Sequence, residues 1–333
     1  MAAACPLCTC PEHTRLFRIS ADQSAQCWAP REQEPDRHRR LSAHIARLWG
    51  RDFADSLECN SCGFGFSDPY VAGDGEFYEL AFGASGYPRD KWEFRETLRV
   101  LEAEPLAAPN VLEVGAGDGH FLNQISPRLV PPSDVLALEY NVHSLEKLRK
   151  RGYRAEATEV ADLVARGERF GAIFMFQVLE HRAEPHELFA AFAELLAPRG
   201  RLFFAVPNDT KARFGADDDE FIDPPPSHVC RWQPGNFGAM AERYGFELRE
   251  SLIEPFSLGD FVRNDLVCSY MRRSQDPRTL ANALYSHRKS TLGRVANASA
   301  VALYAPRQVP TWIRAWRNRR DLGMSLWVHL VRT

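Results

Sequence analysis

Three alternating glycines directly follow a short apolar run in this chain: residues 111–114 are Val-Leu-Glu-Val, and they precede Gly115, Gly117 and Gly119. An apolar run stopped by glycine is typical of a buried strand, and the spacing of apolar residues after the turn is typical of a helix. Glycine lets the backbone turn tightly and approach a ligand closely. The dinucleotide fingerprint G-x-G-x-x-G does not fit, because its third glycine would fall on His120 or Leu122. The turn therefore predicts a strand–turn–helix unit with a ligand at the turn.

From residue 110 onward the chain alternates between strand patterns and helix patterns. Short apolar runs predict seven strands, at 111–114, 135–138, 153–157, 172–176, 202–206, 246–253 and 325–331. Amphipathic segments between them, such as 186–196 and 233–244, predict helices. Strands separated by helices predict an α/β fold with a parallel, doubly wound sheet.

An acidic residue stands where such a sheet would need one to hold a nucleoside. Glu139 ends the second predicted strand, 24 residues after Gly115. A carboxylate at that position can accept hydrogen bonds from both hydroxyls of a ribose. A generic turn that binds another nucleotide is the alternative interpretation of the same residues.

The segment Glu113-Val-Gly115-Ala-Gly117-Asp-Gly119 resembles motif I of class I methyltransferases that use S-adenosylmethionine (SAM). The later run Gln177-Val-Leu-Glu180-His181 and the Val-Pro-Asn that ends the fifth strand resemble the subfamily that includes ubiquinone-pathway O-methyltransferases and many sugar and natural-product enzymes. The resemblance covers about residues 105–256 plus the last strand. It implies a seven-stranded class I domain and a SAM site formed by Glu113, Gly115, Gly117, Gly119, Glu139 and Gln177. Two positions depart from the family pattern, Gly171 and Arg199.

Two histidines are candidates for the chemistry. His181 follows the fourth strand at the edge where ligands bind in such sheets, and a general base there would assist transfer to a hydroxyl. His228 lies in a proline-stiffened segment, similar to one found beside the substrate pocket of related enzymes. The alternatives are a strand-capping polar residue and a rigid surface loop. In related enzymes, the E-x-x-E-H residues that correspond to 177–181 are implicated in binding a divalent metal. Here the first of these positions is Gln177, and an amide is a poorer ligand than a carboxylate.

Two cysteine pairs frame the first part of the chain: Cys5-x-x-Cys8 and Cys59-x-x-Cys62. Paired thiolates of this kind form tetrahedral zinc sites, and four thiolates leave no open position, so the metal would be structural. The 50 intervening residues exceed the usual spacing, which an inserted helix would explain. A similar zinc ribbon precedes the catalytic domain in a group of sugar methyltransferases. Unrelated thiols are the alternative, and Cys10 and Cys27 are spare.

A basic segment separates the sixth and seventh predicted strands. Residues 257–323 contain eleven Arg and one Lys against four Asp and no Glu, although the whole chain has a net charge of −3. Trp312 and Trp316 are spaced to share one helix face with arginines around them. We expect either peripheral membrane or glycolipid contact through 309–320, or a helical cap that packs on the core.

These patterns divide the chain into a zinc-ribbon-like unit (1–75), a helical linker (76–109), a SAM-binding core (110–256), the basic helical insertion (257–323) and the last core strand (324–333). The expected function is methyl transfer from SAM to a hydroxyl or carbon of a small molecule, such as a sugar, a glycan or a natural product. The alternatives are a protein or RNA methyltransferase and a catalytically silent SAM-binding scaffold. The net charge argues against dedicated nucleic-acid binding. Free cysteines without an export signal predict a cytoplasmic protein.

Overall fold

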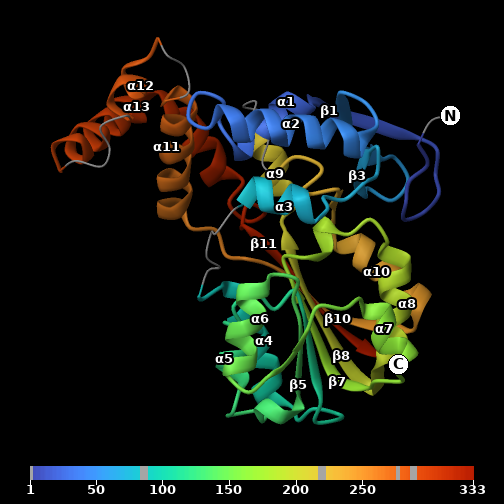
Figure 1. Ribbon diagram of the computed structural model, residues 1–333. Helices are drawn as coiled ribbons and strands as arrows, with labels where there is room; N and C mark the ends of the chain where they lie inside the picture. The colour runs from blue at the N-terminus through green and yellow to red at the C-terminus, as the bar shows by residue number, and fades with distance from the viewer. Residues whose placement is uncertain (1–2, 83–88, 217–222, 275–277, 286–290) are drawn as a thin grey trace.

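The computed structural model describes residues 3–82, 89–216, 223–274, 278–285 and 291–333, and it contains two sheets (Figure 1). The larger sheet has seven strands in the order β10-β11-β8-β7-β4-β5-β6. These strands are β4 (Val111–Val114), β5 (Val135–Leu138), β6 (Arg154–Glu156), β7 (Phe170–Phe176), β8 (Leu196–Pro207), β10 (Phe246–Ile253) and β11 (Ser325–Arg332). The predicted α/β class and seven-stranded sheet are confirmed.

Strand β11 is antiparallel to both strands that it pairs with. β4, β5, β6, β7 and β8 pair in parallel, whereas β11 pairs antiparallel with β8 and with β10. The sheet is therefore mostly rather than wholly parallel. β11 enters between two strands that precede it in sequence, and it brings Trp327 into the sheet, where the indole donates to Thr97 Oγ1 at 2.8 Å.

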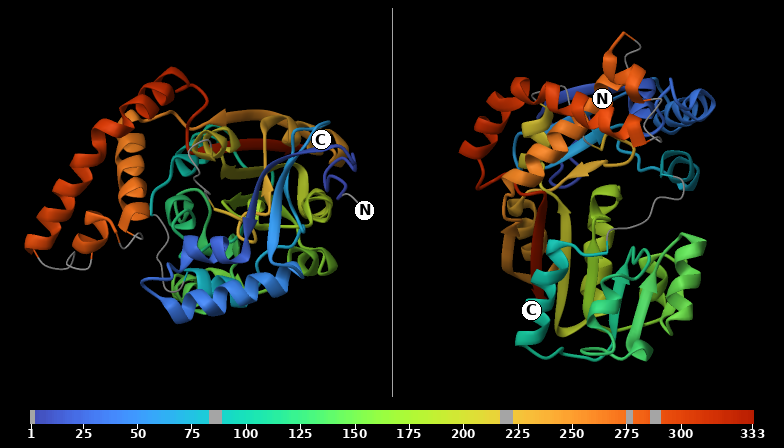
Figure 2. Two further views of the ribbon diagram at one scale, coloured as in Figure 1. Left: turned by 90° about the horizontal axis from the view of Figure 1, so that it is seen from above. Right: turned by 90° about the vertical axis from the view of Figure 1, so that its left-hand side faces the viewer.

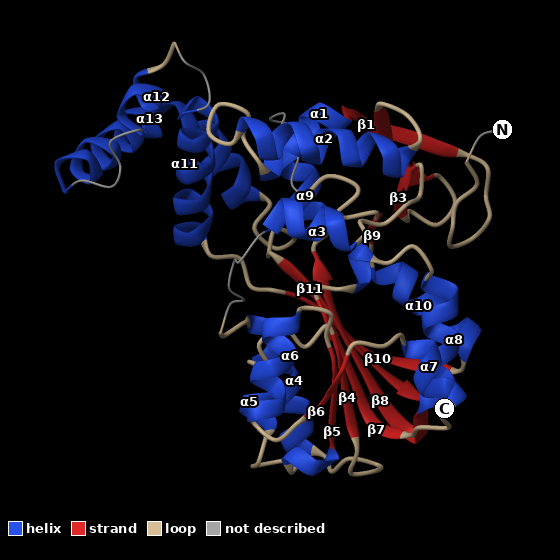
Figure 3. Cartoon of the chain, in the orientation of Figure 1, coloured by secondary structure: helices blue, strands red, loops and turns tan. Residues whose placement is uncertain are grey.

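Helices cover both faces of this sheet (Figure 3). Their apolar faces pack on alternate side chains of the strands and form two buried clusters, which is what the 3.6-residue spacing of their apolar positions requires. One face carries α4 (Trp92–Ala103), α5 (Leu122–Ile125) and α6 (Val142–Lys150), and the other carries α7 (Val160–Ala165), α8 (Pro185–Leu195) and α10 (Pro234–Tyr244). Two short 3₁₀ turns, η1 (Pro132–Asp134) and η2 (Leu179–His181), lie in the connections.

The N-terminal part forms a second sheet above the edge at which the parallel strands end (Figure 1). Its order is β1-β2-β3-β9, and its elements are β1 (His13–Ser20), α1 (Ala21–Trp28), α2 (Pro35–Trp49), β2 (Phe53–Cys59), β3 (Gly65–Asp68), α3 (Gly75–Phe82) and β9 (Cys230–Arg231). α1 and α2 occupy the long interval between the two cysteine pairs, as an inserted helix would. β9 comes from the core, so this sheet is completed by a segment more than 160 residues away from β3.

The basic insertion is helical and projects from the body as an arm (Figure 2). It consists of α11 (Leu258–Ser274), α12 (Leu280–Tyr285) and α13 (Thr291–Arg317), and α9 (Asp209–Ala216) lies at its base. A small apolar cluster of Phe261, Ala315 and Leu322, with Phe214 and Trp312, fastens the arm. In the described parts of the chain, no helix combines the length and apolarity needed to cross a membrane.

The sheet contains one buried histidine that gives the fold a pH dependence. His329 on β11 is 5% exposed, stacks on Phe203 with ring centroids 4.7 Å apart, and has no hydrogen-bond partner among the described residues. Burial, reinforced by Arg201, lowers the pKa of His329 from 6.5 to about 4. Because protonation is disfavoured only in the folded state, this residue's contribution to stability is present above pH 6.5 and is lost as the pH falls towards 4.

We therefore expect His329→Phe to remove part of the acid sensitivity. The difference in unfolding free energy between this variant and the parent should shift in favour of the variant by about 2 kcal/mol between pH 8 and pH 4.5. Denaturant unfolding at both pH values measures it. His143→Phe, at an exposed position of α6, is the control and should show no such shift. A difference that stays constant with pH would contradict the prediction.

Candidate functional site

The glycine turn after β4 has the geometry that only glycine adopts readily. Gly115, Gly117 and Gly119 all have positive φ, at 74°, 51° and 71°. A Cβ on Gly115 would lie 2.4 Å from Val178 Cγ2, and the peptide N–H of Gly115 donates to Leu138 O at 2.9 Å. The turn is thus held against the end of β5 on one side and the segment after β7 on the other. Its backbone faces the edge where the parallel strands end.

Glu139, at the end of β5, is hydrogen-bonded to this turn. Its Oε2 accepts from Gly117 N at 2.7 Å, and its Oε1 accepts from Tyr140 N and Asn141 N, both at 2.8 Å. A carboxylate offers about four acceptor positions, so three backbone bonds leave about one for a ligand hydroxyl. The role of Glu139 as an acceptor for the ribose hydroxyls stays a prediction.

Glu113 supplies an unpartnered carboxylate oxygen beside the turn. Its side chain is buried, and Oε2 has no hydrogen-bond partner among the described residues. Burial raises the pKa of Glu113 well above its usual range, an effect that nearby Lys91 opposes and Glu139 reinforces. A buried carboxyl group without a partner fits a ligand that brings a positive charge or a donor, and SAM carries both a sulfonium and an ammonium group. The residues present therefore fit the cofactor that the resemblance implies.

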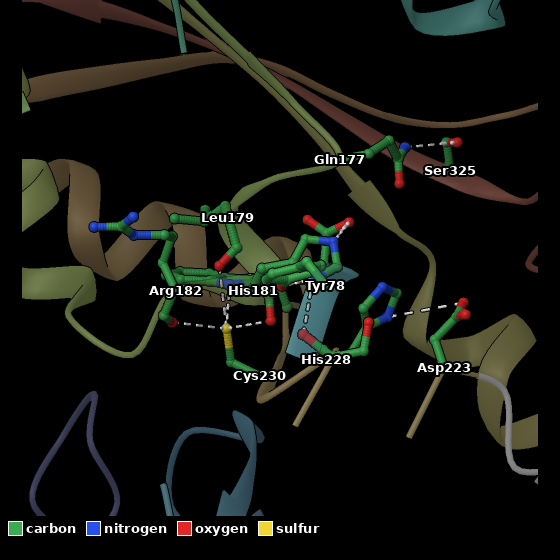
Figure 4. Close-up of polar contacts among 12 residues, drawn as sticks. Tyr78, Gln177, Leu179, His181, Arg182, Asp223, His228, Cys230 and Ser325 are labelled. Carbon is green, nitrogen blue, oxygen red and sulfur yellow. Dashed lines mark hydrogen bonds and ion pairs between the residues drawn. The ribbon is translucent and has the colours of Figure 1, made fainter. Parts of the chain in front are cut away.

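Gln177 lies at the end of β7 in an unusual conformation. It is one of few non-glycine residues with positive φ, at 56°, a conformation often held in place at functional sites. Its Nε2 donates to Glu93 Oε1 at 3.1 Å and to Ser325 Oγ at 3.3 Å, so the amide turns towards α4 and β11 (Figure 4). It is thus directed away from Glu180 and His181. The role of Gln177 in cofactor binding stays a prediction.

The two candidate histidines lie side by side, although they are 47 positions apart in sequence. The ring centroids of His181 and His228 are 4.7 Å apart in an edge-to-face arrangement. His181 Nδ1 lies 2.7 Å from Ser227 O and 3.0 Å from Tyr78 OH (Figure 4). Since the Ser227 carbonyl can only accept, Nδ1 carries the proton and Nε2 keeps its lone pair. Tyr78 was not identified from the sequence, because a lone tyrosine in an aromatic-rich segment has no distinguishing pattern.

Burial sets the charge state of this cluster. It lowers the pKa of His181 to about 4 and that of His228 well below its usual value, and it raises the pKa of Glu180 to about 8. At neutral pH both imidazoles are therefore neutral and Glu180 is protonated. Each neutral imidazole has a ring nitrogen that can accept a proton from a bound acceptor, and its low pKa makes His181 a weaker base than a solvated histidine.

A small pocket opens on the same cluster. It is lined by Glu180, Val206, Pro207, Asp209, His228, Cys230, Arg231 and Trp232. Ligand atoms of Glu180, His181 and His228 also lie within 4.8 Å of one another, so these three side chains could hold a divalent cation. Gln177 does not join them. The pocket residues Asp209 and Arg231 were not identified from the sequence, because neither stands in a recognisable motif.

The four paired cysteines come together in one cluster. The sulfurs of Cys5, Cys8, Cys59 and Cys62 lie within 4.8 Å of one another, with Cys8 Sγ 3.4 Å from Cys59 Sγ. Four cysteine sulfurs at this spacing are the donor set that zinc takes in structural sites. Cys10 and Cys27 are not part of the cluster.

The comparisons with known proteins agree with the geometry. A family described as a methyltransferase domain matches residues 35–251, which is well over half of the chain. The chain therefore belongs to this family of methyltransferase domains.

Individual relatives match over shorter segments. A ubiquinone biosynthesis O-methyltransferase of Xanthomonas oryzae pv. oryzae (strain PXO99A) is 34% identical over 116 residues, 33% of this chain and 47% of the relative. The protein of the same name from Xylella fastidiosa (strain 9a5c) is also 34% identical over 116 residues. The chain thus spans about half the length of these curated relatives. A solved SAM-dependent methyltransferase from Archaeoglobus fulgidus superposes with a TM-score of 0.44 and 16% identity, over 78% of this chain and all of that one.

The three bonds of Glu139 generate a prediction about cofactor affinity. Glu139→Ala should weaken SAM binding by about 10- to 100-fold, because it removes a charged acceptor and releases the glycine turn. Titration calorimetry measures the affinity, and thermal unfolding checks that the variant is folded. Glu146→Ala, at an exposed position of α6, is the matched control and should bind as the parent does. Unchanged SAM affinity in Glu139→Ala would contradict this assignment.

Proposed function

We propose that this chain transfers a methyl group from SAM to a hydroxyl or carbon of a small molecule, with the sugar of a glycan or a natural product as the favoured class of acceptor. The observation that carries the proposal is the placement of the two turns. The glycine turn follows β4 and the histidine turn follows β7, and these are neighbouring parallel strands. The O-methyltransferase names of the relatives support the same reaction type.

The chemistry assigned to the chain is positioning and proton transfer. Bound SAM supplies an electrophilic methyl group. An acceptor bound beside His228 would form the new bond from its oxygen to the methyl carbon while the carbon–sulfur bond breaks. One of the two neutral imidazoles accepts the hydroxyl proton. Ser227 O holds His181 in one orientation, in which Nε2 lies 3.8 Å from Glu180 Oε1.

Replacement of the histidines tests this role. His181→Asn and His228→Asn should each lower turnover of a hydroxyl acceptor by roughly 10²- to 10⁴-fold, with nearly unchanged SAM affinity. Transfer of labelled methyl groups from SAM to candidate acceptors is the assay, and His143→Asn on the surface of α6 is the control. Normal turnover in both variants would show that no histidine base is needed. No transfer to any acceptor by the parent would favour a silent SAM-binding scaffold.

We also propose that the cluster of Cys5, Cys8, Cys59 and Cys62 binds one structural zinc ion. The closeness of the four sulfurs supports this assignment. Thiolates that bind zinc persist in a reducing compartment, which favours the cytoplasm.

We further propose that the outer face of α13 contacts an anionic membrane surface and brings the enzyme to a lipid-linked acceptor. Val309, Ile313 and Trp316 are 40%, 49% and 49% exposed, and Arg317 and Arg320 are exposed beside them. Trp312 does not share this exposure, because its Nε1 donates to Asp265 Oδ2 at 2.7 Å and its ring packs at the base of the arm. An apolar strip flanked by arginines suits a bilayer interface, where each cation contributes about 1 kcal/mol.

Vesicle sedimentation tests the membrane contact. The parent should bind vesicles that contain phosphatidylserine, bind less at higher salt, and ignore phosphatidylcholine vesicles. The double variant Arg317→Glu, Arg320→Glu should lose this binding. The matched control reverses the same amount of charge on α2, with Arg39→Glu and Arg40→Glu, and should still bind. Absence of parental binding at low salt would leave the arm as a structural cap.

A further inference from the structure

The two-residue strand β9 joins the cysteine cluster to the histidine turn. On one side it pairs with β3, with Gly65 opposite Arg231 and Phe66 opposite Cys230, and Ser67 N donates to Val229 O at 2.9 Å. On the other side Val229 N donates to Glu180 O at 3.0 Å. The Cys230 thiol lies 3.3 Å from Leu179 O. β9 is therefore bonded at once to the N-terminal sheet and to the turn that carries Glu180 and His181.

The other end of this connection begins at the second cysteine pair. β3 starts three residues after Cys62, and Cys59 N donates to Phe64 O at 2.9 Å, so the cysteine turn leads directly into the strand that β9 joins. The strands are close there, since a Cβ on Gly65 would lie 2.8 Å from Arg231 Cβ. Next to β9, Trp232 is buried edge-to-face against Phe64 with ring centroids 5.0 Å apart.

Two further bonds fix the cysteine turns to the helices of the core. Asn236 on α10 donates from Nδ2 to Cys62 O at 2.8 Å. His186 on α8 places its Nε2 3.0 Å from Leu7 O, between Cys5 and Cys8. Both cysteine pairs are thus attached to elements that pack directly on the large sheet.

We propose that the four-cysteine cluster is a positioning element of the acceptor site, and that its metal holds His228 and His181 in place through β9. This inference rests on the proposed function of the two histidines. His228 lies two residues before Cys230, and His181 bonds to the carbonyl of Ser227, so the segment 227–231 carries one histidine and orients the other. A metal keeps the two cysteine turns together, and β3 transmits that constraint to β9. Loss of the metal frees β3 and, with it, the histidine pair.

The first experiment removes the metal from the full chain. Cys5→Ser with Cys62→Ser should abolish zinc binding at the cysteine cluster, and metal analysis should show the loss of about one zinc ion per chain. The imidazole NMR resonances of His181 and His228, assigned with the asparagine variants, should shift or broaden. SAM affinity should change by less than about threefold, because the glycine turn is bonded to β5 and is connected to β9 only indirectly, through the segment after β7. The control, Cys10→Ser with Cys27→Ser, should alter neither zinc content nor the histidine resonances.

A second variant disturbs the contact between β3 and β9 without removing the metal. Gly65→Ala should retain zinc but push β3 away from Arg231, so the histidine resonances should shift and turnover should fall by at least tenfold, mainly in kcat. Thermal unfolding checks that both variants are folded. Unchanged histidine resonances in the zinc-free variant would overturn the inference, as would a parent that binds no zinc. If the resonances shift but the parent transfers no methyl group, the proposed function fails while the positioning by the cysteine cluster stands.

Discussion

The burial of β7 determines where the candidate chemistry lies. All seven of its residues, Phe170–Phe176, are buried between β4 and β8, so the first polar side chain comes only after the end of the strand. The first polar residue, Gln177, leaves the sheet with positive φ while its N–H still bonds to Ala205 O. The chain then turns through η2, which presents Glu180 and His181 beside the glycine turn of the neighbouring strand. The candidate cofactor-binding and acceptor-binding residues thus follow two neighbouring strands at a single edge of the sheet.

The N-terminal unit and the core share one interior. Cys5, Leu7, Phe64 and Phe66 belong to the same buried cluster as Phe189, Trp232 and Phe237 of the core. A unit that looks separate in sequence is therefore continuous in packing, and its sheet is completed by β9. A polar contact also joins the N-terminal unit to the core: Ser24 Oγ donates to Pro225 O at 2.7 Å, three residues before His228.

Much of this arrangement follows from local sequence, and the remainder depends on contacts between distant segments. The strand before Gly115, the helix over 233–244 and the strand 246–253 show clear apolar spacing, which predicts them closely. The two cysteine pairs were expected to meet, and their sulfurs do. β9, by contrast, is too short to give any periodic signal, and it forms only because β3 offers an open edge. Tyr78 and Glu93 reach the site from a segment with no motif, so only the fold reveals them.

The position of β11 has a consequence for the order in which the protein assembles during synthesis. β8 and β10 flank β11, yet both leave the ribosome long before residues 325–332 do. Until then β10 has no strand to pair with, and the hydrogen-bonding edge of β8 that β11 later covers is open to water. A nascent chain therefore carries two exposed strand edges while the basic arm is being made, and such edges pair readily with other chains. The basic segment 257–323 emerges during that interval, and its net positive charge makes neighbouring nascent chains repel one another when their strand edges are exposed.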